Sequence, residues 1–252
     1  MTSGGELSDF DGAWDFGNPA ASERTFRALL ERHAGAPPAY RLALRTQIAR
    51  ALGLQKKFDE GHALLDDVER ELGAEAVPRI RYLLERGRLL NSSSRPLEAR
   101  PLFVQATALA REQHEDRLAV DAAHMVAITL RGQEALDANF EALRMAEASE
   151  QEGARSFKGS LYNNIGWGYH DLGEYERALE YFEKGVEFRR VQGKPGPLHV
   201  ARWAVARTLR SLGRLEQALA LQLELKAAHA GTDPYVEDEI AACRQALGGS
   251  EP

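Results

Sequence analysis

Side chains that bind charged and apolar groups recur along this sequence in several separate segments. An arginine guanidinium pairs with a carboxylate through two parallel hydrogen bonds, an asparagine amide can hold a peptide backbone, and a tryptophan face buries apolar or cationic side chains. These residue types favour recognition of an extended peptide that carries acidic groups or ends in a carboxylate. The candidate peptide-binding residues are Arg50, Arg81, Arg88, His124, Asn163, Asn164, Trp167, His170, Trp203, Arg207 and Arg210.

Catalysis is the alternative chemistry, and two histidines are the residues best suited to it. His124 follows closely after Asp121, and His170 lies directly before Asp171. If the fold brings the two rings together, they could share a metal ion or transfer a proton, with a carboxylate orienting one ring. That arrangement would suit a hydrolase or a metal-dependent enzyme.

No motif in the sequence specifies a reaction. The chain has no HExxH, no GxSxG nucleophile elbow, no phosphate-binding GxxxxGK[ST] and no pair of CxxC motifs. The simpler interpretation of His124 is a neutral residue that makes hydrogen bonds. We therefore expect a protein that is not an enzyme and that needs neither a cofactor nor a metal ion.

The elements that position these side chains are visible as an internal repeat. One complete unit runs from Tyr162 through a turn at Gly173 to Phe182. Within it, Gly166 and Ala178 are small enough to let two helices approach closely. Residues equivalent to Ala178 recur at spacings of 38, 39, 40 and 40 residues, which gives five units. These equivalents are Gly61, Ala99, Ala138 and Ala218, and the small residues of the preceding helices are Ala49, Gly87, Ala127 and Ala206.

On these residues the chain resembles the tetratricopeptide-repeat proteins, from about Arg41 to Gln245. The resemblance implies an all-α, right-handed α-solenoid of about five helix-turn-helix repeats with terminal capping segments. The spacings exceed the family's common unit of about 34 residues and are similar to those of bacterial-type, stand-alone members. In the third repeat, Gly132 leaves one residue fewer between the helices than in the fourth, so its register stays open by one residue.

The resemblance also implies where the candidate residues lie. In this family the first helix of each repeat lines a concave groove for protein or peptide ligands, so the arginines would contact negative charge, the asparagines the peptide backbone and the tryptophans an apolar side chain. The lysines of the family's carboxylate clamp are absent here. Two alternatives stay open: the tryptophans pack between adjacent repeats, and the arginines pair with Glu85, Asp121 and Asp171. A peptide-responsive regulatory protein is the alternative function.

Both ends of the chain differ from the repeats, so four parts are expected. They are an acidic and aromatic segment (1–19), a capping helix with a linker (20–40), the repeats (41–232), and a capping helix with a loose tail (233–252). In the first segment, Trp14 and Phe16 either cap the exposed end of the first repeat or occupy the groove as a built-in competitor. In the last, Ile240, Cys243 and Leu247 form an apolar strip that either packs as a cap or supports a homodimer.

Composition restricts the partners and the compartment. The 252 residues carry a net charge of −6 and are 44% hydrophobic, which disfavours nucleic acid as a partner and is sufficient for a continuous repeat core. No apolar stretch is long enough to span a bilayer, and the N-terminus lacks the pattern of an export signal, so we expect a cytoplasmic protein with no membrane partner. The single cysteine, Cys243, suits a reducing compartment.

Overall fold

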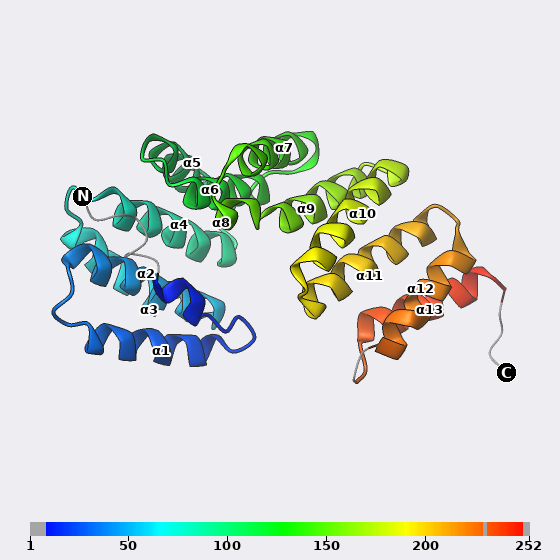
Figure 1. The fold of residues 1–252 in the computed structure, drawn as a ribbon, viewed down its shortest axis with the longest axis horizontal. Helices are drawn as coiled ribbons and strands as arrows, with labels where there is room; N and C mark the ends of the chain where they lie inside the picture. The colour runs from blue at the N-terminus through cyan, green and yellow to red at the C-terminus, as the bar shows by residue number, and fades with distance from the viewer. Residues whose placement is uncertain (1–8, 229–230, 249–252) are drawn as a thin grey trace. The chain divides into compact units, whose positions relative to one another are not determined.

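The structure, a computed structural model, describes residues 9–228 and 231–248. The first eight residues of the expected N-terminal segment and residues 249–252 of the expected tail lie outside this part. Within the described ranges every regular element is a helix (Figure 1). The helices are η1 (Asp9–Ala13, a 3-10 helix), α1 (Pro19–Arg32), α2 (Pro38–Leu54), α3 (Phe58–Glu71), α4 (Ala76–Ser92), α5 (Pro96–Glu112), α6 (Asp116–Ile128), α7 (Gly132–Ala148), α8 (Glu152–Arg155), α9 (Lys158–Asp171), α10 (Tyr175–Gln192), α11 (Pro195–Ser211), α12 (Leu215–Ala228) and α13 (Pro234–Ala246).

The helices form two compact units. The first unit consists of Met1–Leu130 and Ala148–Ala154, and the second of Arg131–Glu147 and Arg155–Pro252. Helices η1 and α1 to α6 therefore belong to the first unit, whereas nearly all of α7 and the whole of α9 to α13 belong to the second.

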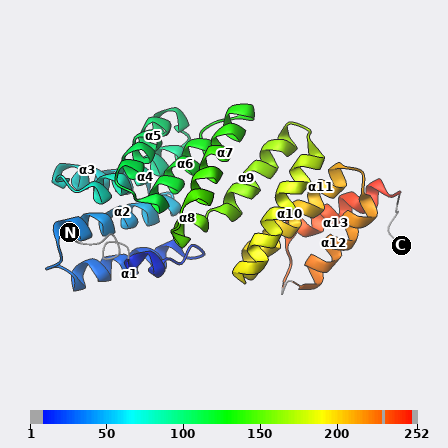
Figure 2. The same cartoon turned by 45° about the horizontal axis from the view of Figure 1, so that its top comes forward.

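In both units, helices pack in succession along the chain. In the first unit α2 packs against α3 and α4, and α5 packs against α4 and α6; in the second, α10 packs against α9 and α11, and α12 against α11 and α13 (Figure 1, Figure 2). In the described part of the chain α2 pairs with α3, α4 with α5, α9 with α10 and α11 with α12, while α6 and α7 follow each other in sequence at the boundary between the units and α13 follows α12. The predicted all-α repeat fold with about five helix pairs is confirmed. No helix in the described part of the chain is both long and apolar enough to cross a membrane.

A small residue in the first helix of a pair makes room for an aromatic ring of the second helix. In α9, a Cβ atom placed on Gly166 would lie 2.5 Å from a ring carbon of Phe182 on α10. In α4, a Cβ atom on Gly87 would lie 2.5 Å from a ring carbon of Phe103 on α5. Both rings are fully buried. These glycines therefore set how closely the two helices of a pair approach.

The turns inside the pairs use a left-handed residue. Gly173 has φ 78°, and the next N–H, that of Glu174, donates to the Tyr169 carbonyl at 2.9 Å. The corresponding residues of the first two pairs are Lys56 and Ser94, with φ of 61° and 66°. A left-handed conformation destabilises a residue with a Cβ atom by about 1–2 kcal/mol. Lys56 and Ser94 therefore lower the stability of the first unit, whereas Gly173 adopts the same turn without this cost.

The buried stripe of α7 bears on the register of the third repeat, which the sequence leaves open by one residue. In α10 the stripe begins at Ala178 and continues four and seven residues later. The residues buried with the same spacing in α7 are Asn139, Leu143 and Ala146. The expected equivalent, Ala138, is only half-buried. The Asn139 side-chain N–H donates to a backbone carbonyl one turn earlier at 2.8 Å, whereas its Oδ1 has no hydrogen-bond partner in the described part of the chain. The stripe is thus compatible with an equivalent of Ala178 one residue later than Ala138.

The N-terminal segment packs its aromatic residues on the first helices. Phe10 is buried with its ring edge-on to Tyr40 of α2, at 5.6 Å between ring centroids. Trp14 lies edge-on to Phe26 of α1 at 4.8 Å, and its indole N–H donates to Gln47 Oε1 at 3.1 Å. The segment therefore covers the end of the first unit.

The C-terminal helix α13 packs on the second unit through its apolar side. Asp233 caps the helix by accepting hydrogen bonds from the N–H groups of Tyr235 and Val236. Val236 and Ile240 are buried in one cluster with Leu225 of α12. The apolar strip that we considered for a homodimer is thus largely covered by the chain itself, because α12 lies against it.

Substitution of the helix-contact glycines tests the close approach. Gly166→Ala should lower the free energy of unfolding by roughly 1–3 kcal/mol, because the new methyl group collides with the Phe182 ring. Gly185→Ala in α10 is the matched control, since its Cβ would meet Tyr162 at an ordinary 3.6 Å and alanine gains up to about 1 kcal/mol of helix propensity. Chemical denaturation measures both; equal effects would contradict the packing role.

Truncation of the N-terminal aromatic residues tests the capping contact. Phe10→Ala should cost about 3–4 kcal/mol of stability, because the ring is buried against Tyr40. Phe16→Ala should cost about 1 kcal/mol or less, since that ring is 60% exposed. Thermal unfolding of the two variants gives the comparison, and a neutral Phe10→Ala would show that the segment does not cap the fold.

Candidate functional site

The candidate residues fall into two groups, one in each unit. The first unit holds, on α2, α4 and α6, Arg50, Arg81, Arg88 and His124. The second unit holds, on α9 and α11, Asn163, Asn164, Trp167, His170, Trp203, Arg207 and Arg210. All seven residues of the second group are half-buried, so each has part of its surface available for contact.

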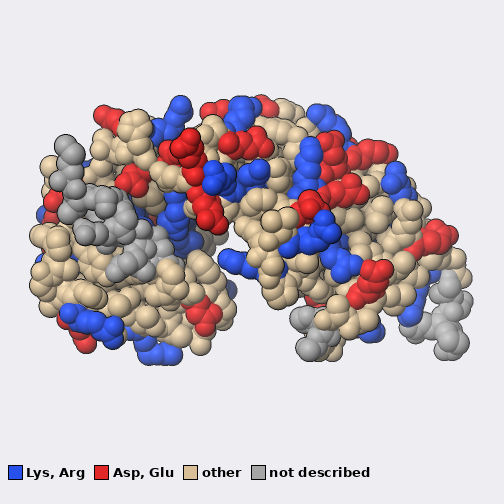
Figure 3. Space-filling view, viewed as in Figure 1, with Lys and Arg blue, Asp and Glu red and all other residues tan. Residues whose placement is uncertain are grey.

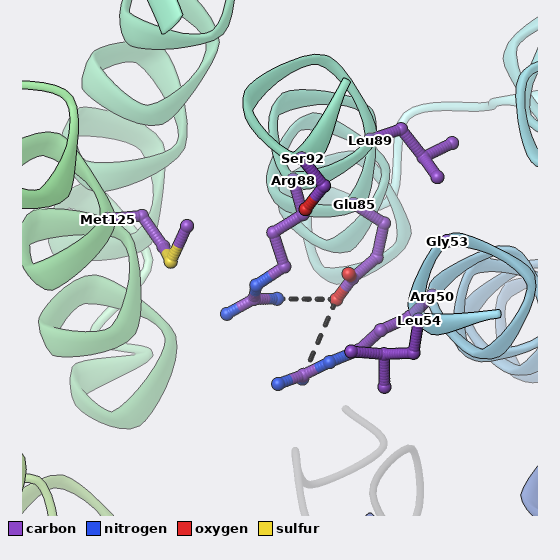
Figure 4. A pocket seen from close by; sticks show the side chains of 8 residues that line it. All are labelled: Arg50, Gly53, Leu54, Glu85, Arg88, Leu89, Ser92 and Met125. Atoms are coloured by element: carbon purple, nitrogen blue, oxygen red, sulfur yellow. Dashed lines mark hydrogen bonds and ion pairs between the residues drawn. The ribbon is translucent and has the colours of Figure 1, made fainter. Parts of the chain in front are cut away.

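Arg88 on α4 is the centre of the first group. Its Nη1 donates to Glu85 Oε1 on the same helix at 2.6 Å, and its Nη2 donates to Asp121 Oδ1 on α6 at 2.5 Å. Arg50 on α2 approaches the same oxygen of Glu85 at 3.9 Å, which is beyond hydrogen-bond distance (Figure 4). The side chains of Glu85 and Asp121 are 2% and 10% exposed. Two buried carboxylates therefore neutralise arginines on this surface.

Burial and mutual charge shift the pKa values of this cluster. Burial alone would raise the pKa of Asp121, but the charges of Arg88 and Arg50 and the hydrogen bond from Arg88 hold it at about 2. Burial alone would lower the pKa of Arg88, yet Asp121 and Glu85 raise it. Burial lowers the pKa of Arg50, and the charge of Arg88 adds to the effect. Burial also lowers the pKa of His124, so this histidine is neutral near pH 7.

A pocket of about 190 Å³ opens between α2, α4 and α6. Figure 4 shows the Arg50 and Arg88 guanidinium groups reaching one oxygen of Glu85, which lies between them. The other oxygen of Glu85 is buried and has no hydrogen-bond partner within the described residues. The pocket is lined by Arg50, Gly53, Leu54, Glu85, Arg88, Leu89, Ser92 and Met125.

The N-terminal aromatic residues also cover arginines of the first group. The guanidinium carbon of Arg50 lies 5.3 Å from the ring centroids of Trp14 and Phe16, and that of Arg81 lies 5.2 Å from the Phe10 ring. The rings that pack on the first helices thus also form cation–π contacts with two of the candidate binding residues, Arg50 and Arg81.

The second unit presents a row of aromatic rings from α9, α11 and α13. The ring centroids of Trp167 and Trp203 are 6.1 Å apart, and those of Trp203 and Tyr235 are 6.2 Å apart. Trp167 also lies edge-on to the buried Phe182 at 5.0 Å. Each tryptophan therefore packs between neighbouring helices and still keeps part of its surface exposed. Tyr235, which sequence analysis did not single out, is 72% exposed.

Beside this row, two arginines share one carboxylate. Arg210 donates from Nε and Nη2 to the two oxygens of Glu239 on α13, at 2.7 and 2.9 Å, and Arg207 Nε lies 3.0 Å from the same carboxylate. Arg207 Nη1 donates to the Ser211 hydroxyl at 2.9 Å, and His170 Nε2 lies 3.0 Å from that hydroxyl. Burial and then the charge of Arg207 lower the pKa of His170, so this ring is also neutral near pH 7.

Sequence analysis missed a regular relation between the arginines and their acidic partners. Arg50, Arg88 and Arg207 each directly follow the small residue of a first helix. Each pairs with a carboxylate on the next first helix, 35, 33 and 32 residues later. We call these three contacts, Arg50–Glu85, Arg88–Asp121 and Arg207–Glu239, the inter-repeat ion pairs. The recurrent spacing of an arginine and an acid would have been the signal to look for.

The surface charge agrees with this pairing. Figure 3 shows basic and acidic side chains interspersed over the visible face of each unit. Acidic side chains therefore neutralise most of the charge of the candidate arginines. This is the second of the two alternatives given in the sequence analysis, in which the arginines pair with acids such as Glu85 and Asp121.

The two histidines considered for catalysis lie in different units, His124 on α6 and His170 on α9. Within the described ranges, no group of three or more histidine, cysteine, aspartate or glutamate side chains is placed to hold a metal ion. Burial raises the pKa of the Cys243 thiol, which disfavours the reactive thiolate.

Comparison with known proteins supports the tetratricopeptide resemblance. Residues 159–191, which include most of α9 and α10, match the sequence model of the tetratricopeptide repeat. Comparison with curated protein sequences gives no match.

Solved structures share the fold. A signal transduction ATPase with numerous domains and a tetratricopeptide repeat sensor, from Pyrococcus horikoshii, is 16% identical with a TM-score of 0.71, over 93% of this chain and 40% of that one. BtubC from P. vanneervenii is 15% identical with a TM-score of 0.63, over 95% and 94%. NprR in complex with its cognate peptide NprX is 16% identical with a TM-score of 0.61, over 98% and 74%. At these identities the likeness concerns the fold alone.

Acid titration tests the role of the Asp121 carboxylate. Its pKa of about 2 in the folded state lies below the value of about 3.9 for a free aspartate, so its stabilisation is complete above about pH 5 and is lost progressively as the pH falls through 4 towards 2. Asp121→Asn should therefore lower the free energy of unfolding at pH 7 by about 2 kcal/mol. Its difference from the wild type should shrink below pH 4.

Asp66→Asn is the control for this titration. Asp66 also pairs with an arginine, but its side chain is 56% exposed, so its loss should cost about 1 kcal/mol or less. Equal losses in the two variants at pH 7 would show that burial does not strengthen the Asp121 pair.

Proposed function

We propose that this chain is a non-catalytic scaffold that binds an extended acidic peptide along α9, α11 and α13 of the second unit. The observation that carries the proposal is the row of Trp167, Trp203 and Tyr235 beside the guanidinium groups of Arg207 and Arg210. Apolar and anionic side chains of one peptide would find both kinds of partner there.

The spacing of the rings suits an extended chain. Alternate side chains of a β-strand point to the same face and lie about 6.4–6.8 Å apart. The successive ring centroids of the row are 6.1 and 6.2 Å apart. A peptide that runs along the row can therefore place every second side chain against a ring.

The charge of the site favours an acidic peptide. Arg207 and Arg210 both pair with the single carboxylate of Glu239, so the two guanidinium groups share one partner. Each guanidinium has five N–H donors. Arg210 uses Nε and Nη2 on Glu239, and its side chain is 26% exposed, which leaves donors for a peptide carboxylate.

Two further features support a peptide ligand. Asn163 and Asn164 lie half-buried on α9, four and three residues before Trp167, and side-chain amides can bind a peptide backbone. NprR, which shares the fold along 98% of this chain, has a cognate peptide bound. A regulatory protein that responds to such a peptide would use the same contacts.

A peptide-display selection on the full chain tests the proposal. We expect enrichment of acidic sequences with apolar residues at alternate positions, with binding that weakens as the salt concentration rises. Arg207→Gln should weaken an enriched peptide at least tenfold, which corresponds to about 1.4 kcal/mol.

Arg202→Gln is the matched control for that selection. Arg202 lies on the same helix and has a similar exposure of 31%, but it pairs with Glu224 of α12. It should change peptide affinity less than twofold. Failure to enrich any peptide, or equal losses in the two variants, would contradict a site on this face.

A further inference from the structure

His170 contacts both the aromatic and the arginine part of the surface on α9, α11 and α13. Its ring centroid lies 5.1 Å from that of Trp167 and 4.9 Å from that of Tyr175 on α10. Its Nε2 lies 3.0 Å from the Ser211 hydroxyl, which accepts a hydrogen bond from Arg207 Nη1. The residue is half-buried. A charge on this imidazole would therefore act on both parts of the surface.

The Ser211 hydroxyl can serve either protonation state of the ring. A hydroxyl has one O–H donor and two acceptor lone pairs. When His170 is neutral, the hydroxyl can donate to Nε2 while it accepts from Arg207 Nη1. When His170 is protonated, its Nε2–H donates to the hydroxyl oxygen, and the hydroxyl can donate instead to the Arg207 carbonyl at 3.3 Å. The ring can thus gain a proton without losing its hydrogen bond.

Charged side chains of α9, α11 and α13 act on this imidazole. Burial and the charges of two arginines lower the pKa of His170, and the charges of two carboxylates oppose the shift. Tyr175 of α10 is a further titratable side chain in contact with the ring. Without a ligand, the ring therefore gains its charge only below about pH 6.5, the ordinary value for histidine. The charged groups are, in falling order of effect, Arg207, Asp171, Arg210 and Glu239.

A bound acidic peptide would change this balance. Its carboxylates would lie at Arg207 and Arg210, near the imidazole, and a negative charge there favours the protonated ring. Peptide binding would then raise the pKa of His170 and take up a proton. By linkage, protonation of the ring strengthens peptide binding by the same factor. The affinity is lowest where the ring stays neutral even with peptide bound, and it rises with falling pH until the ring is charged in the free protein.

We propose that His170 makes the peptide site proton-sensitive, so that acidic peptides bind more tightly at mildly acidic pH than at neutral pH. This inference rests on the proposed function, because it concerns the same site. The charged ring adds a cation beside Arg207 and Arg210, and it lies within cation–π distance of Trp167.

Calorimetry on the full chain at about pH 7.5 and about pH 5.5 tests the proton dependence. The probe is a synthetic peptide in which leucine alternates with cysteic acid, because a sulfonate keeps its charge over this range. The wild type should bind it about threefold to tenfold more tightly at the lower pH. His170→Gln keeps a hydrogen-bonding group but cannot gain a proton, so it should bind the peptide equally at both pH values.

His199→Gln is the matched control. His199 lies on α11 of the same unit, but its Nε2 lies 2.8 Å from Asp233 Oδ2. This variant should therefore keep the pH dependence of the wild type. If His199→Gln loses the dependence and His170→Gln keeps it, the proton is taken up elsewhere and the inference is wrong.

Titration of the His170 imidazole by NMR needs no variant for its main result. The pKa of His170 in the wild type should rise when the peptide is added. In the protein without peptide, Arg207→Gln should also raise it, because the Arg207 charge lowers it.

Two outcomes separate this inference from the proposed function. Peptide binding that is equal at both pH values, with an unchanged pKa of His170, would overturn the inference alone and leave the peptide site in place. Absence of binding at both pH values, by this peptide and by any selected peptide, would overturn the proposed function and this inference with it.

Discussion

The close approach of the two helices in each pair is the constraint on which the other features of this protein depend. At Gly87 and Gly166 the first helix carries no side chain, and the rings of Phe103 and Phe182 occupy the space. Because this contact fixes which face of the first helix is buried, it also fixes the direction of every other side chain on that helix.

The position directly after the small residue gains a specific role from this arrangement. In three of the five repeats it is an arginine, at Arg50, Arg88 and Arg207, and each reaches a carboxylate on the following first helix. The inter-repeat ion pairs are half-buried, so leaving one partner alone is costly, whereas the pair itself adds modest stability. Their main effect is to position neighbouring first helices relative to each other within a unit.

The fold could be predicted from the sequence because small and aromatic residues recur at a regular spacing. Few other residues could replace them where two helices approach closely. The register of the third repeat stayed open by one residue, since Ala138 is as small as its equivalents and the burial of Asn139, Leu143 and Ala146 becomes visible only in the fold. The packing of the apolar side of α13 against α12 could not be predicted either. The sequence of an apolar strip is the same whether the strip packs on a helix of its own chain or on a second chain.

The candidate site could be predicted only in part. The spacing of the first helices placed arginines and tryptophans on common surfaces, but carboxylates more than thirty residues away look like ordinary surface acids until the fold brings them close. The N-terminal segment was ambiguous for a physical reason, since Trp14 packs on the core with one side of its ring system and lies near Arg50 with another.

The direction of the inter-repeat ion pairs has a consequence for how such an array can grow or be recombined. Each contact joins an arginine of one repeat to an acid on the next first helix, and for Arg207 that acid is Glu239 of α13. A repeat inserted into the middle of the chain preserves the charge balance only if it brings both an acid for its predecessor and an arginine for its successor. Duplication of the repeat formed by α4 and α5, which carries both Glu85 and Arg88, satisfies that condition, whereas a foreign repeat of the same shape satisfies it only if it carries both residues.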